Sequence, residues 1–349
     1  MNKIPVAVLA ATGSVGQRFV QLLDNHPWFE VTALTGSDRG QGKTYGEVCR
    51  WLLAEDMPEW ARSMPVLPST PEVVQTPLAF SGLPADIARD VEPLFARAGT
   101  AVCSNASAYR REPDVPILLP EINADHARVI DAQRLRCGWT GLIATNPNCT
   151  STGMTIALRP ILDAFGLKRV FAVSMQALSG AGYPGVPSMD IIDNVIPNVS
   201  GEEDKVEFEP LKMLGKVEDG HIQLAEFGIS AHTNRVAVSD GHTVCLSIEL
   251  EQHASPAEVA AVLSNYQADE MARDLPFSPR PPIVVRTEDN RPQVRLDRMT
   301  GKGMTTVVGR VRPDSLFDIR MVVLSHNTIR GAAGGSIYNA ELLVKMGYI

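Results

Sequence analysis

Short apolar runs alternate with stretches of helical periodicity over residues 1–147. The apolar runs predict buried strands at residues 5–9, 31–34, 78–80, 101–103, 117–119 and 142–144. Residues 17–24 show the pattern of a helix, and the proline-rich stretch 56–77 predicts an irregular surface excursion. Apolar strands that alternate with helices are typical of a parallel sheet covered on both faces.

The pattern changes after residue 148. Alternation of apolar and polar residues predicts longer strands at residues 169–175, 243–251, 305–311 and 317–325. The long stretch 180–220 is expected to be irregular, and residues 335–346 predict a final helix that packs back on the first domain. We therefore expect an α/β protein with one domain of residues 1–147 and 330–349. The second domain, residues 148–329, is expected to be α+β with a mainly antiparallel sheet.

Composition and charge narrow the class of protein. The chain has 349 residues, 44% of them hydrophobic and 21% charged, as in an ordinary globular protein of two domains. The formal net charge of −8 argues against nonspecific nucleic-acid binding. The early apolar run 6–11 is too short to span a membrane, so we expect a cytoplasmic protein without an anchor. The five cysteines lack CxxC spacing, which indicates neither a metal site nor a disulfide framework.

One cysteine has a position suited to chemistry. Cys149 lies within Asn-Pro-Asn-Cys-Thr-Ser-Thr-Gly, residues 146–153, after a turn and before a stretch of helical periodicity. Unpaired N–H groups and the dipole at a helix N-terminus favour negative charge. We therefore expect a lowered thiol pKa and a nucleophilic thiolate. The same N–H groups are suited to stabilise an oxyanion at an attacked carbonyl.

The first predicted strand leads into a glycine-containing turn, residues 10–17, that opens a helix. Glycine at Gly13 lets the backbone approach a pyrophosphate, which then binds at the helix N-terminus. This turn predicts a Rossmann-like NADP-binding domain, although Ala10 replaces the first glycine of the usual pattern. A strand-to-helix turn without a ligand is the alternative interpretation.

The end of the second predicted strand carries hydroxyl and cationic side chains. Ser37, Arg39 and Lys43 suit a ribose 2′-phosphate and favour NADP. Asp38 leaves NAD open, because an acidic residue here accepts from a free 2′-hydroxyl. A solvated basic loop is the alternative interpretation.

A nucleophilic cysteine needs an acid or base within hydrogen-bond reach. Among the seven histidines, His232 and His242 are candidates, and His242 follows a glycine turn that can direct its ring into a cleft. The histidines judged surface-like are His26, His126 and His253. Arg235 is suited to hold a carboxylate through two parallel hydrogen bonds. A structural role for His242 and a surface ion pair for Arg235 are the alternatives.

Several segments occur in a characteristic order. They are Asn-Pro-Asn-Cys-Thr around Cys149, Gln-Ala-Leu-Ser-Gly-Ala-Gly-Tyr-Pro-Gly at 176–185, Asn-Val-Ser-Gly-Glu-Glu-Asp-Lys at 198–205, residues 234–243, and residues 325–335. With these motifs the chain resembles the aspartate-β-semialdehyde dehydrogenases, in their archaeal and fungal branch, over residues 4–349.

The resemblance implies a role for each matched position. Cys149 would be the nucleophile, His242 the general acid/base, and Gln176 would orient the reacting thiohemiacetal. The substrate would be bound by Arg235 (α-carboxylate), Glu202 (ammonium), Lys205 and Arg110 (phosphate) and Asn148 beside the thiol. The cofactor would be bound by Thr12, Gly13, Ser14, Val15, Ser37, Arg39, Lys43, Ser81, Gly82, Ser179, Gly180 and Asn327. From the residues alone, Glu202 and Lys205 are also consistent with a helix-surface pair, and Arg111 is an alternative to Arg110.

The resemblance also implies a reaction. NADPH would reduce β-aspartyl phosphate to aspartate semialdehyde, with release of phosphate, through a thioester on Cys149 between a cofactor domain and a catalytic and dimerisation domain. It further implies a homodimer or homotetramer and a place in the biosynthesis of lysine, threonine, methionine and isoleucine. Neither nucleic acid nor a membrane is an expected partner.

Other functions remain open from the sequence. A malonyl-CoA reductase, or another acyl-CoA or acyl-phosphate reductase, would use the same scaffold. A Cys-His hydrolase or acyltransferase and a non-catalytic nucleotide sensor are rivals from other classes. Two positions depart from the family pattern, Ala10 in the pyrophosphate turn and Gly40, where the family often has a serine near the 2′-phosphate. Ala10 bears on the strength of cofactor binding, and Gly40 on the preference for NADP over NAD.

Overall fold

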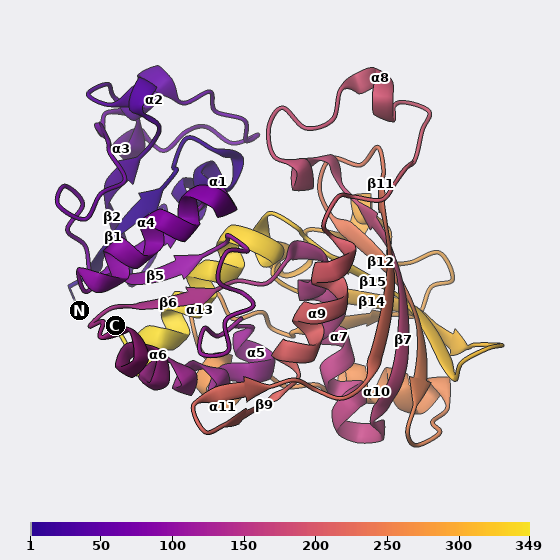
Figure 1. Ribbon diagram of the computed structural model, residues 1–349. Coiled ribbons are helices and arrows are strands. Elements are labelled where there is room, and N and C mark those ends of the chain that lie inside the picture. Colours follow the sequence, from indigo (N-terminus) through magenta and orange to yellow (C-terminus); the bar gives the residue numbers. More distant parts are fainter. Residues whose placement is uncertain (1) are drawn as a thin grey trace.

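The computed structural model describes residues 2–349 and has two halves, each built on its own sheet (Figure 1). The strands are β1 Ile4–Leu9, β2 Phe29–Thr35, β3 Val66–Leu67, β4 Leu78–Ser81, β5 Ala101–Ser104, β6 Leu142–Thr145, β7 Leu167–Gln176, β8 Ile196–Pro197, β9 Lys216–Glu218, β10 His221–Gln223, β11 Gly228–Arg235, β12 His242–Leu250, β13 Ile283–Arg286, β14 Thr306–Pro313 and β15 Ile319–Ser325. The α-helices are α1 Ser14–Leu22, α2 Tyr45–Val48, α3 Glu59–Arg62, α4 Ala85–Arg97, α5 Pro120–Asn123, α6 Val129–Cys137, α7 Cys149–Phe165, α8 Ser188–Ile191, α9 Glu203–Met213, α10 Pro256–Ser264, α11 Glu270–Arg273, α12 Val294–Asp297 and α13 Gly334–Lys345.

The first sheet has the strand order β3-β2-β1-β4-β5-β6, and all its pairs are parallel. Side chains on its two faces enter different cores. Val6 and Val8 of β1 pack with α1 and α13, whereas Ala7 and Leu9 pack with α4. Burial on both faces explains the apolar runs and confirms the predicted α/β class with a Rossmann-like first domain.

The second sheet has the order β13-β14-β15-β12-β7-β11-β8 and is mixed. Its central pairs are antiparallel, as expected, but β11 pairs with β7 and β13 pairs with β14 in parallel. Along β12, fully buried residues face α7 and α10, and half-buried ones alternate with them. In Figure 1, α7 and α9 lie between this sheet and the first half. The helices therefore cover one face of the sheet more completely than the other.

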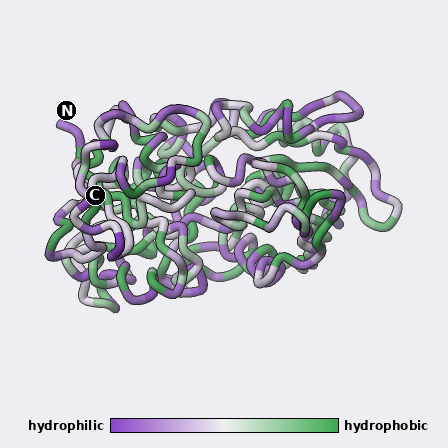
Figure 2. Tube along the Cα trace, turned by 90° about the horizontal axis from the view of Figure 1, so that it is seen from above, coloured by the Kyte–Doolittle hydropathy of each residue, from purple (hydrophilic) through white to green (hydrophobic). Residues whose placement is uncertain are grey.

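The final helix α13 returns to the first half of the molecule. Its residues Ile337, Ala340 and Leu343 belong to the same core as β1. Figure 2 shows the result from above, an elongated molecule with the two ends of the chain at the same end. No helix within residues 2–349 is long and apolar enough to cross a membrane.

Three predicted elements differ from the structure. Residues 117–119 make one isolated bridge, from Ile117 to Thr145, because the chain turns directly into α5 at Pro120. The predicted excursion 56–77 contains α3 and the edge strand β3. The stretch 180–220, expected to be irregular, contains the eleven-residue helix α9, whose many charged residues and internal Pro210 mask its periodicity.

Two histidines judged surface-like are buried. His26 lies 2.8 Å from the Glu341 carboxylate through Nε2 and stacks on Phe29. His126 lies between Asn123 and the Gly215 carbonyl. Each ring has one partner distant in sequence, Glu341 for His26 and Gly215 for His126, so local polarity did not reveal their burial.

Candidate active site

The turn before α7 delivers a single thiol to the boundary between the halves. Asn148 is the N-cap of α7, and its side-chain oxygen accepts from the N–H groups of Thr150 (2.9 Å) and Ser151 (3.3 Å). Cys149 is therefore the first helical residue, but the cap already occupies two N–H groups of the first turn.

Strand register brings three distant residues to one edge of the second sheet. Gln176 ends β7 and Arg235 ends β11, and the two are paired in the parallel register. His242 begins the antiparallel β12, so it meets the same edge. Parallel strands share their carboxyl ends and an antiparallel neighbour adds its amino end. The sheet therefore collects these residues beside α7.

The Cys149 sulfur and the His242 ring are in direct contact. Sγ lies 3.1 Å from Nε2. The backbone N–H of Ala177 donates to Nδ1 of His242 at 3.0 Å. Because Nδ1 accepts, a neutral ring carries its proton on Nε2, facing the sulfur.

Burial acts on both groups of this pair. Two causes raise the pKa of the Cys149 thiol to about 12. Burial is the larger cause, and the nearby Glu202 carboxylate is the second. The expectation of a lowered thiol pKa is therefore wrong for this structure. Burial is also the larger cause at His242, and the positive charge of Arg235 is the second. Together they lower the pKa of the ring to about 3. The ring is consequently neutral at physiological pH.

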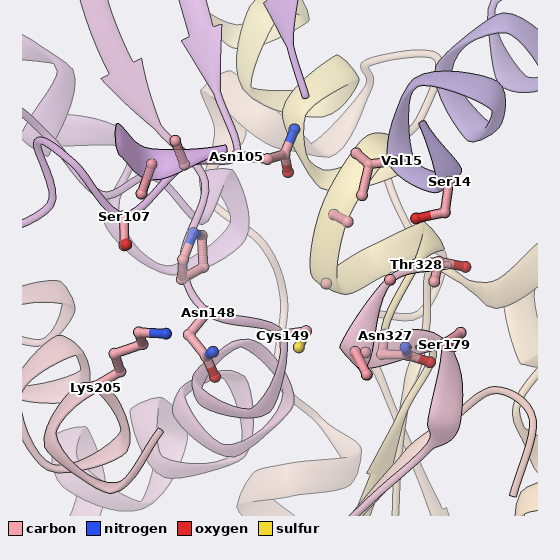
Figure 3. A pocket seen from close by; sticks show the side chains of 18 of the residues that line it. Ser14, Val15, Asn105, Ser107, Asn148, Cys149, Ser179, Lys205, Asn327 and Thr328 are labelled. Atoms are coloured by element: carbon pink, nitrogen blue, oxygen red, sulfur yellow. Dashed lines mark hydrogen bonds between the residues drawn. The ribbon is translucent and has the colours of Figure 1, made fainter. Parts of the chain in front are cut away.

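A cavity of about 350 Å³ opens over the sulfur and is lined from both halves. Figure 3 shows Cys149 between two groups of side chains. One side carries Asn148, Ser107 and Lys205, and the other carries Ser14, Thr328, Asn327 and Ser179. We call these the phosphate side and the cofactor side, after the ligands that the sequence predicts for them.

Several predicted residues line this cavity, and others lie behind its wall. The predicted residues that line it are Ser14, Val15, Arg110, Asn148, Cys149, Ser179, Gly180, Glu202, Lys205 and Asn327. Gln176, Arg235 and His242 are buried and do not line the cavity, and the last two lie next to the backbone at Gly180. A Cβ at Gly180 would lie 2.9 Å from Nη1 of Arg235 and 3.1 Å from Cε1 of His242. A side chain at Gly180 would therefore require the Arg235 guanidinium and the His242 ring to shift.

The phosphate side consists of paired charges. Lys205 donates to the Glu202 carboxylate at 2.8 Å, and Arg110 donates to Glu209 at 2.9 Å. Arg111 instead stacks over the Phe208 ring, with its guanidinium carbon 4.4 Å from the centroid, and does not line the cavity. Arg110, not its neighbour, is therefore the arginine presented to the thiol.

Sequence reasoning missed Glu209. A signal was present, because Glu202, Lys205, Glu209 and Lys212 follow one another at spacings of three, four and three residues. Such spacing places side chains on one face of a helix. These residues lie in the stretch expected to be irregular, and their spacing is that of charged residues instead of the apolar ones that predict a helix.

The cofactor side is built from backbone and neutral groups. Gly13 is the N-cap of α1, and no side chain caps this helix. A Cβ at Gly16 would lie 2.2 Å from the Ala10 carbonyl oxygen, which keeps the turn tight. Ala10 itself has a φ of 57°, a left-handed conformation that favours glycine. The departure at Ala10 thus preserves the shape of the turn at some cost in strain.

The tail of the chain completes this side. Asn327 accepts from the Gly241 N–H at 2.7 Å and donates to the Ser179 hydroxyl at 2.8 Å. Gly331 packs so closely that a Cβ there would lie 2.8 Å from that of Cys149. The adjacent Arg330 is fully buried and pairs with Glu121 at 2.6 Å. These contacts fix the tail against the nucleophile.

The remaining predicted cofactor residues do not line the cavity. Ser37, Arg39 and Lys43 are exposed after β2, where Asp38 accepts from the side chain of Gln41 at 2.7 Å. The others that do not line the cavity are Thr12, Gly13, Ser81, which is fully buried, and Gly82. Within residues 2–349, no group of three or more His, Cys, Asp or Glu side chains is arranged to hold a metal ion.

Comparisons with known proteins agree with this geometry. Residues 5–130 match the family model "Semialdehyde dehydrogenase, NAD binding domain", and residues 158–330 match "Semialdehyde dehydrogenase, dimerisation domain". The chain is 50% identical to the aspartate-semialdehyde dehydrogenase of Archaeoglobus fulgidus, over 97% of this chain and 98% of that protein. Identity to the Schizosaccharomyces pombe enzyme of the same name is 43%, over 98% of each. The crystal structure of aspartate semialdehyde dehydrogenase with NADP from Candida albicans matches with a TM-score of 0.92, 41% identity and full coverage of both chains.

Proposed function

The chain belongs to the aspartate-semialdehyde dehydrogenase family, and on this premise we propose that it reduces β-aspartyl phosphate to aspartate semialdehyde with NADPH, through a thioester on Cys149. One observation carries the proposal. A single cavity is lined by the thiol, by the cations Arg110 and Lys205, and by the turn at Ser14. A nucleophile, a phosphate-binding pair and a dinucleotide turn are the parts that this reaction needs. We place the reaction in the biosynthesis of lysine, threonine, methionine and isoleucine.

The chemistry begins with the acyl group. The Cys149 thiol loses its proton as the sulfur attacks the acyl carbon, the new C–S bond forms as the C–O bond to phosphate breaks, and phosphate leaves with the electron pair and takes up a proton. Arg110 and Lys205 stabilise the charge of the leaving phosphate. When bound, NADPH supplies the hydride that reduces the acyl carbon. Cleavage of the C–S bond then releases the aldehyde and restores the thiolate.

His242 is suited to one part of this sequence. Each addition step places negative charge on the acyl oxygen, and a neutral Nε2–H beside the sulfur can donate a hydrogen bond to that oxyanion. Because Nδ1 already accepts from Ala177, the ring is poorly arranged to receive a proton. His242 is expected to act as both acid and base, and this geometry favours the role of hydrogen-bond donor over that of proton acceptor.

The residues of the first half suit NADP. The first turn of α1 has no side-chain cap, so its N–H groups are available to a pyrophosphate. Gly82 packs against the same turn, since a Cβ there would lie in van der Waals contact with the Leu9 carbonyl (3.4 Å) and the Gly16 nitrogen (3.5 Å). Ser14 and Val15 would hold the phosphates, Arg39 and Lys43 the 2′-phosphate, and Asn327 the nicotinamide end.

The direct test is reduction of NADP by aspartate semialdehyde with and without inorganic phosphate. We expect turnover to require phosphate, because the thioester must be released by phosphorolysis. Phosphate-independent oxidation would instead indicate a hydrolytic aldehyde dehydrogenase and would contradict the proposal. In the reverse direction, a strong preference for malonyl-CoA over β-aspartyl phosphate would assign the scaffold to the rival acyl-CoA reductase.

We also propose a homodimer formed through the second sheet. On the face away from α7, half-buried side chains gather around Cys245, which is paired in register with Val173 and Val322. Phe171 and Met175 continue this face along β7. Such an apolar sheet face is suited to a second copy. Light scattering should give at least twice the chain mass, and Val173→Asp should yield monomers. A monomeric wild-type protein would contradict the assembly.

A further inference from the structure

One face of α9 carries the charges that organise the phosphate side. Glu202 precedes the helix, and Lys205, Glu209 and Lys212 follow along the same face, with alternating sign. Glu202 and Lys205 line the cavity. Glu209 and Lys212 do not line it and are nearly inaccessible to solvent, with 2% of each residue exposed. Buried charges persist only where partners compensate for lost hydration, so their partners are informative.

Glu209 joins two structures that are far apart in sequence. Its Oε1 accepts from Nη1 of Arg110 at 2.9 Å, and its Oε2 accepts from the backbone N–H of Asn148 at 2.5 Å. Arg110 is a proposed phosphate ligand, and Asn148 is the cap residue directly before the nucleophile. One carboxylate therefore connects the phosphate site to the nucleophile turn.

The arginine has few other constraints. Its Nη2 donates to the Asn105 carbonyl at 2.7 Å, and its Nε has no hydrogen-bond partner within the described chain. Arg110 has a long side chain with several rotamers, so the Glu209 contact does much to select its orientation. Without that contact we expect the guanidinium to sample positions away from the cavity.

Lys212 binds the backbone of the loop that carries Arg110. Its ammonium group donates to the carbonyl oxygens of Arg110 and Val115, each at 2.8 Å, and also to that of Glu112. The helix α9 thus holds the loop at both its backbone and the guanidinium of Arg110. This arrangement is more than a generic ion pair, because both ends of the Arg110 residue are fixed by the same helix face.

We propose that Glu209 is a positioning residue for acyl-phosphate chemistry: it fixes the Arg110 guanidinium relative to the backbone at Asn148, so that the phosphate is held at a set place beside the Cys149 sulfur. Glu209 itself touches neither substrate nor thiol in this role. The inference rests on the proposed function, since it concerns the phosphate of that reaction.

The test is steady-state kinetics of the Glu209→Gln variant with aspartate semialdehyde, NADP and inorganic phosphate. Glutamine keeps the shape but cannot accept from both donors with full charge. Loss of a charge-assisted contact predicts a rise in the KM for phosphate of about 10-fold to 100-fold, with the KM for NADP unchanged. Equal changes in both KM values would indicate general loosening and would overturn the proposal.

The chain offers a matched control on the same helix. Glu207 accepts the backbone N–H of Ala231 at 3.0 Å, so it also joins α9 to another element through one carboxylate. It points to the second sheet and is absent from the cavity lining. Glu207→Gln should leave the KM for phosphate at the wild-type value. If it raises that KM as much as Glu209→Gln does, the effect belongs to the helix as a whole and the proposal fails.

A double-mutant cycle separates positioning from other effects. If Glu209 acts through Arg110, then Glu209→Gln should not raise the KM for phosphate further in an Arg110→Gln background. Additive effects would overturn the proposal. The double variant removes both buried charges together, so it can still be measured if Glu209→Gln alone does not fold.

The wild-type enzyme distinguishes this inference from the proposed function. A wild-type enzyme that works without phosphate would overturn both, whereas normal phosphate dependence with an unchanged KM for phosphate in Glu209→Gln would overturn this inference alone.

Discussion

The two sides of Cys149 are built by opposite means. On the cofactor side, the surroundings are a glycine turn, a helix N-terminus without a side-chain cap, and the neutral amide of Asn327. On the phosphate side, Arg110 and Lys205 are each paired with a carboxylate of the α9 segment. The first side selects by the shape of its backbone, and the second by charge.

Because of this difference, substitutions should impair ligand binding on the two sides in different ways. Shape set by backbone changes when a residue such as Gly16, where a Cβ would lie 2.2 Å from the Ala10 carbonyl oxygen, acquires a side chain. A buried charge pair fails as soon as one partner is lost, because the remaining charge is then unpaired. We therefore expect substitutions on the phosphate side to act through orientation and charge, and those on the cofactor side through affinity for the dinucleotide.

The largest effect should come from the residue that the two sides share. Cys149→Ser replaces the thiol by a hydroxyl that is a far weaker nucleophile, and kcat should fall by at least about 1,000-fold. Binding of NADPH, followed by fluorescence, should persist, because the cofactor side is unchanged. Cys137→Ser, on α6 and away from the cavity, is the control and should retain activity. Turnover that survives in Cys149→Ser would rule out a thioester mechanism.

The next effect concerns the group beside the sulfur. His242→Ala removes the Nε2–H donor and should lower kcat by about 100-fold to 1,000-fold. In the wild-type enzyme, burial lowers the pKa of His242 to about 3, so the ring stays neutral as pH rises from 5 to 8. The profile of kcat against pH should then show no histidine limb near the ordinary value of about 6.5. A limb there that disappears in His242→Ala would instead favour proton transfer.

The two sides also differ in how well the sequence predicts them. The cofactor turn is one contiguous segment, residues 10–17, between a strand and a helix, so local pattern sufficed. Cys149, likewise, was identified from its own helix start. The sheet edge that joins Gln176, Arg235 and His242 depends on register between strands, and β11 was not predicted. Motif resemblance named these residues, but their proximity required the fold.

The phosphate side shows where local pattern fails. Helix α9 contains many charged residues and Pro210. Its charged residue Glu209 is buried, because its carboxylate binds Arg110 and the backbone N–H of Asn148. Periodicity of apolar residues cannot detect a helix whose buried face is charged. The raised pKa of Cys149 was missed for a related reason, because burial of the sulfur and, after it, the carboxylate of Glu202 depend on the tertiary fold and not on the local helix start.

A smaller effect would sharpen the account of the cofactor side. Arg39→Ala removes an exposed cation near the predicted 2′-phosphate and should raise the KM for NADPH by about 10-fold. The KM values for NADH and for phosphate should stay unchanged, since NADH lacks the 2′-phosphate and inorganic phosphate binds on the other side of Cys149. Arg62→Ala, which removes another exposed arginine, on α3, is the control. A parallel rise in the KM for NADH would show that Arg39 does not read the 2′-phosphate.

The smallest effect tests whether charge on the phosphate side reaches the thiol. With the pKa of Cys149 raised to about 12, the thiolate fraction is small at pH 8, and alkylation by iodoacetamide should quicken about 10-fold per unit of pH up to pH 10. Glu202→Gln removes the carboxylate that helps raise this pKa, so alkylation at pH 8 should be about 3-fold to 5-fold faster. Glu203, whose carboxylate accepts from the N–H of Thr233 in the sheet, provides the matched control, and Glu203→Gln should react like wild type.

The outcome also bears on substrate binding. If Glu202 holds the substrate's ammonium group, that positive charge cancels the effect of the Glu202 carboxylate on the thiol pKa, and the thiol becomes more acidic when substrate binds. Equal alkylation of Glu202→Gln and wild type would mean that burial alone sets the thiol pKa, and that the phosphate side positions the substrate without tuning the nucleophile.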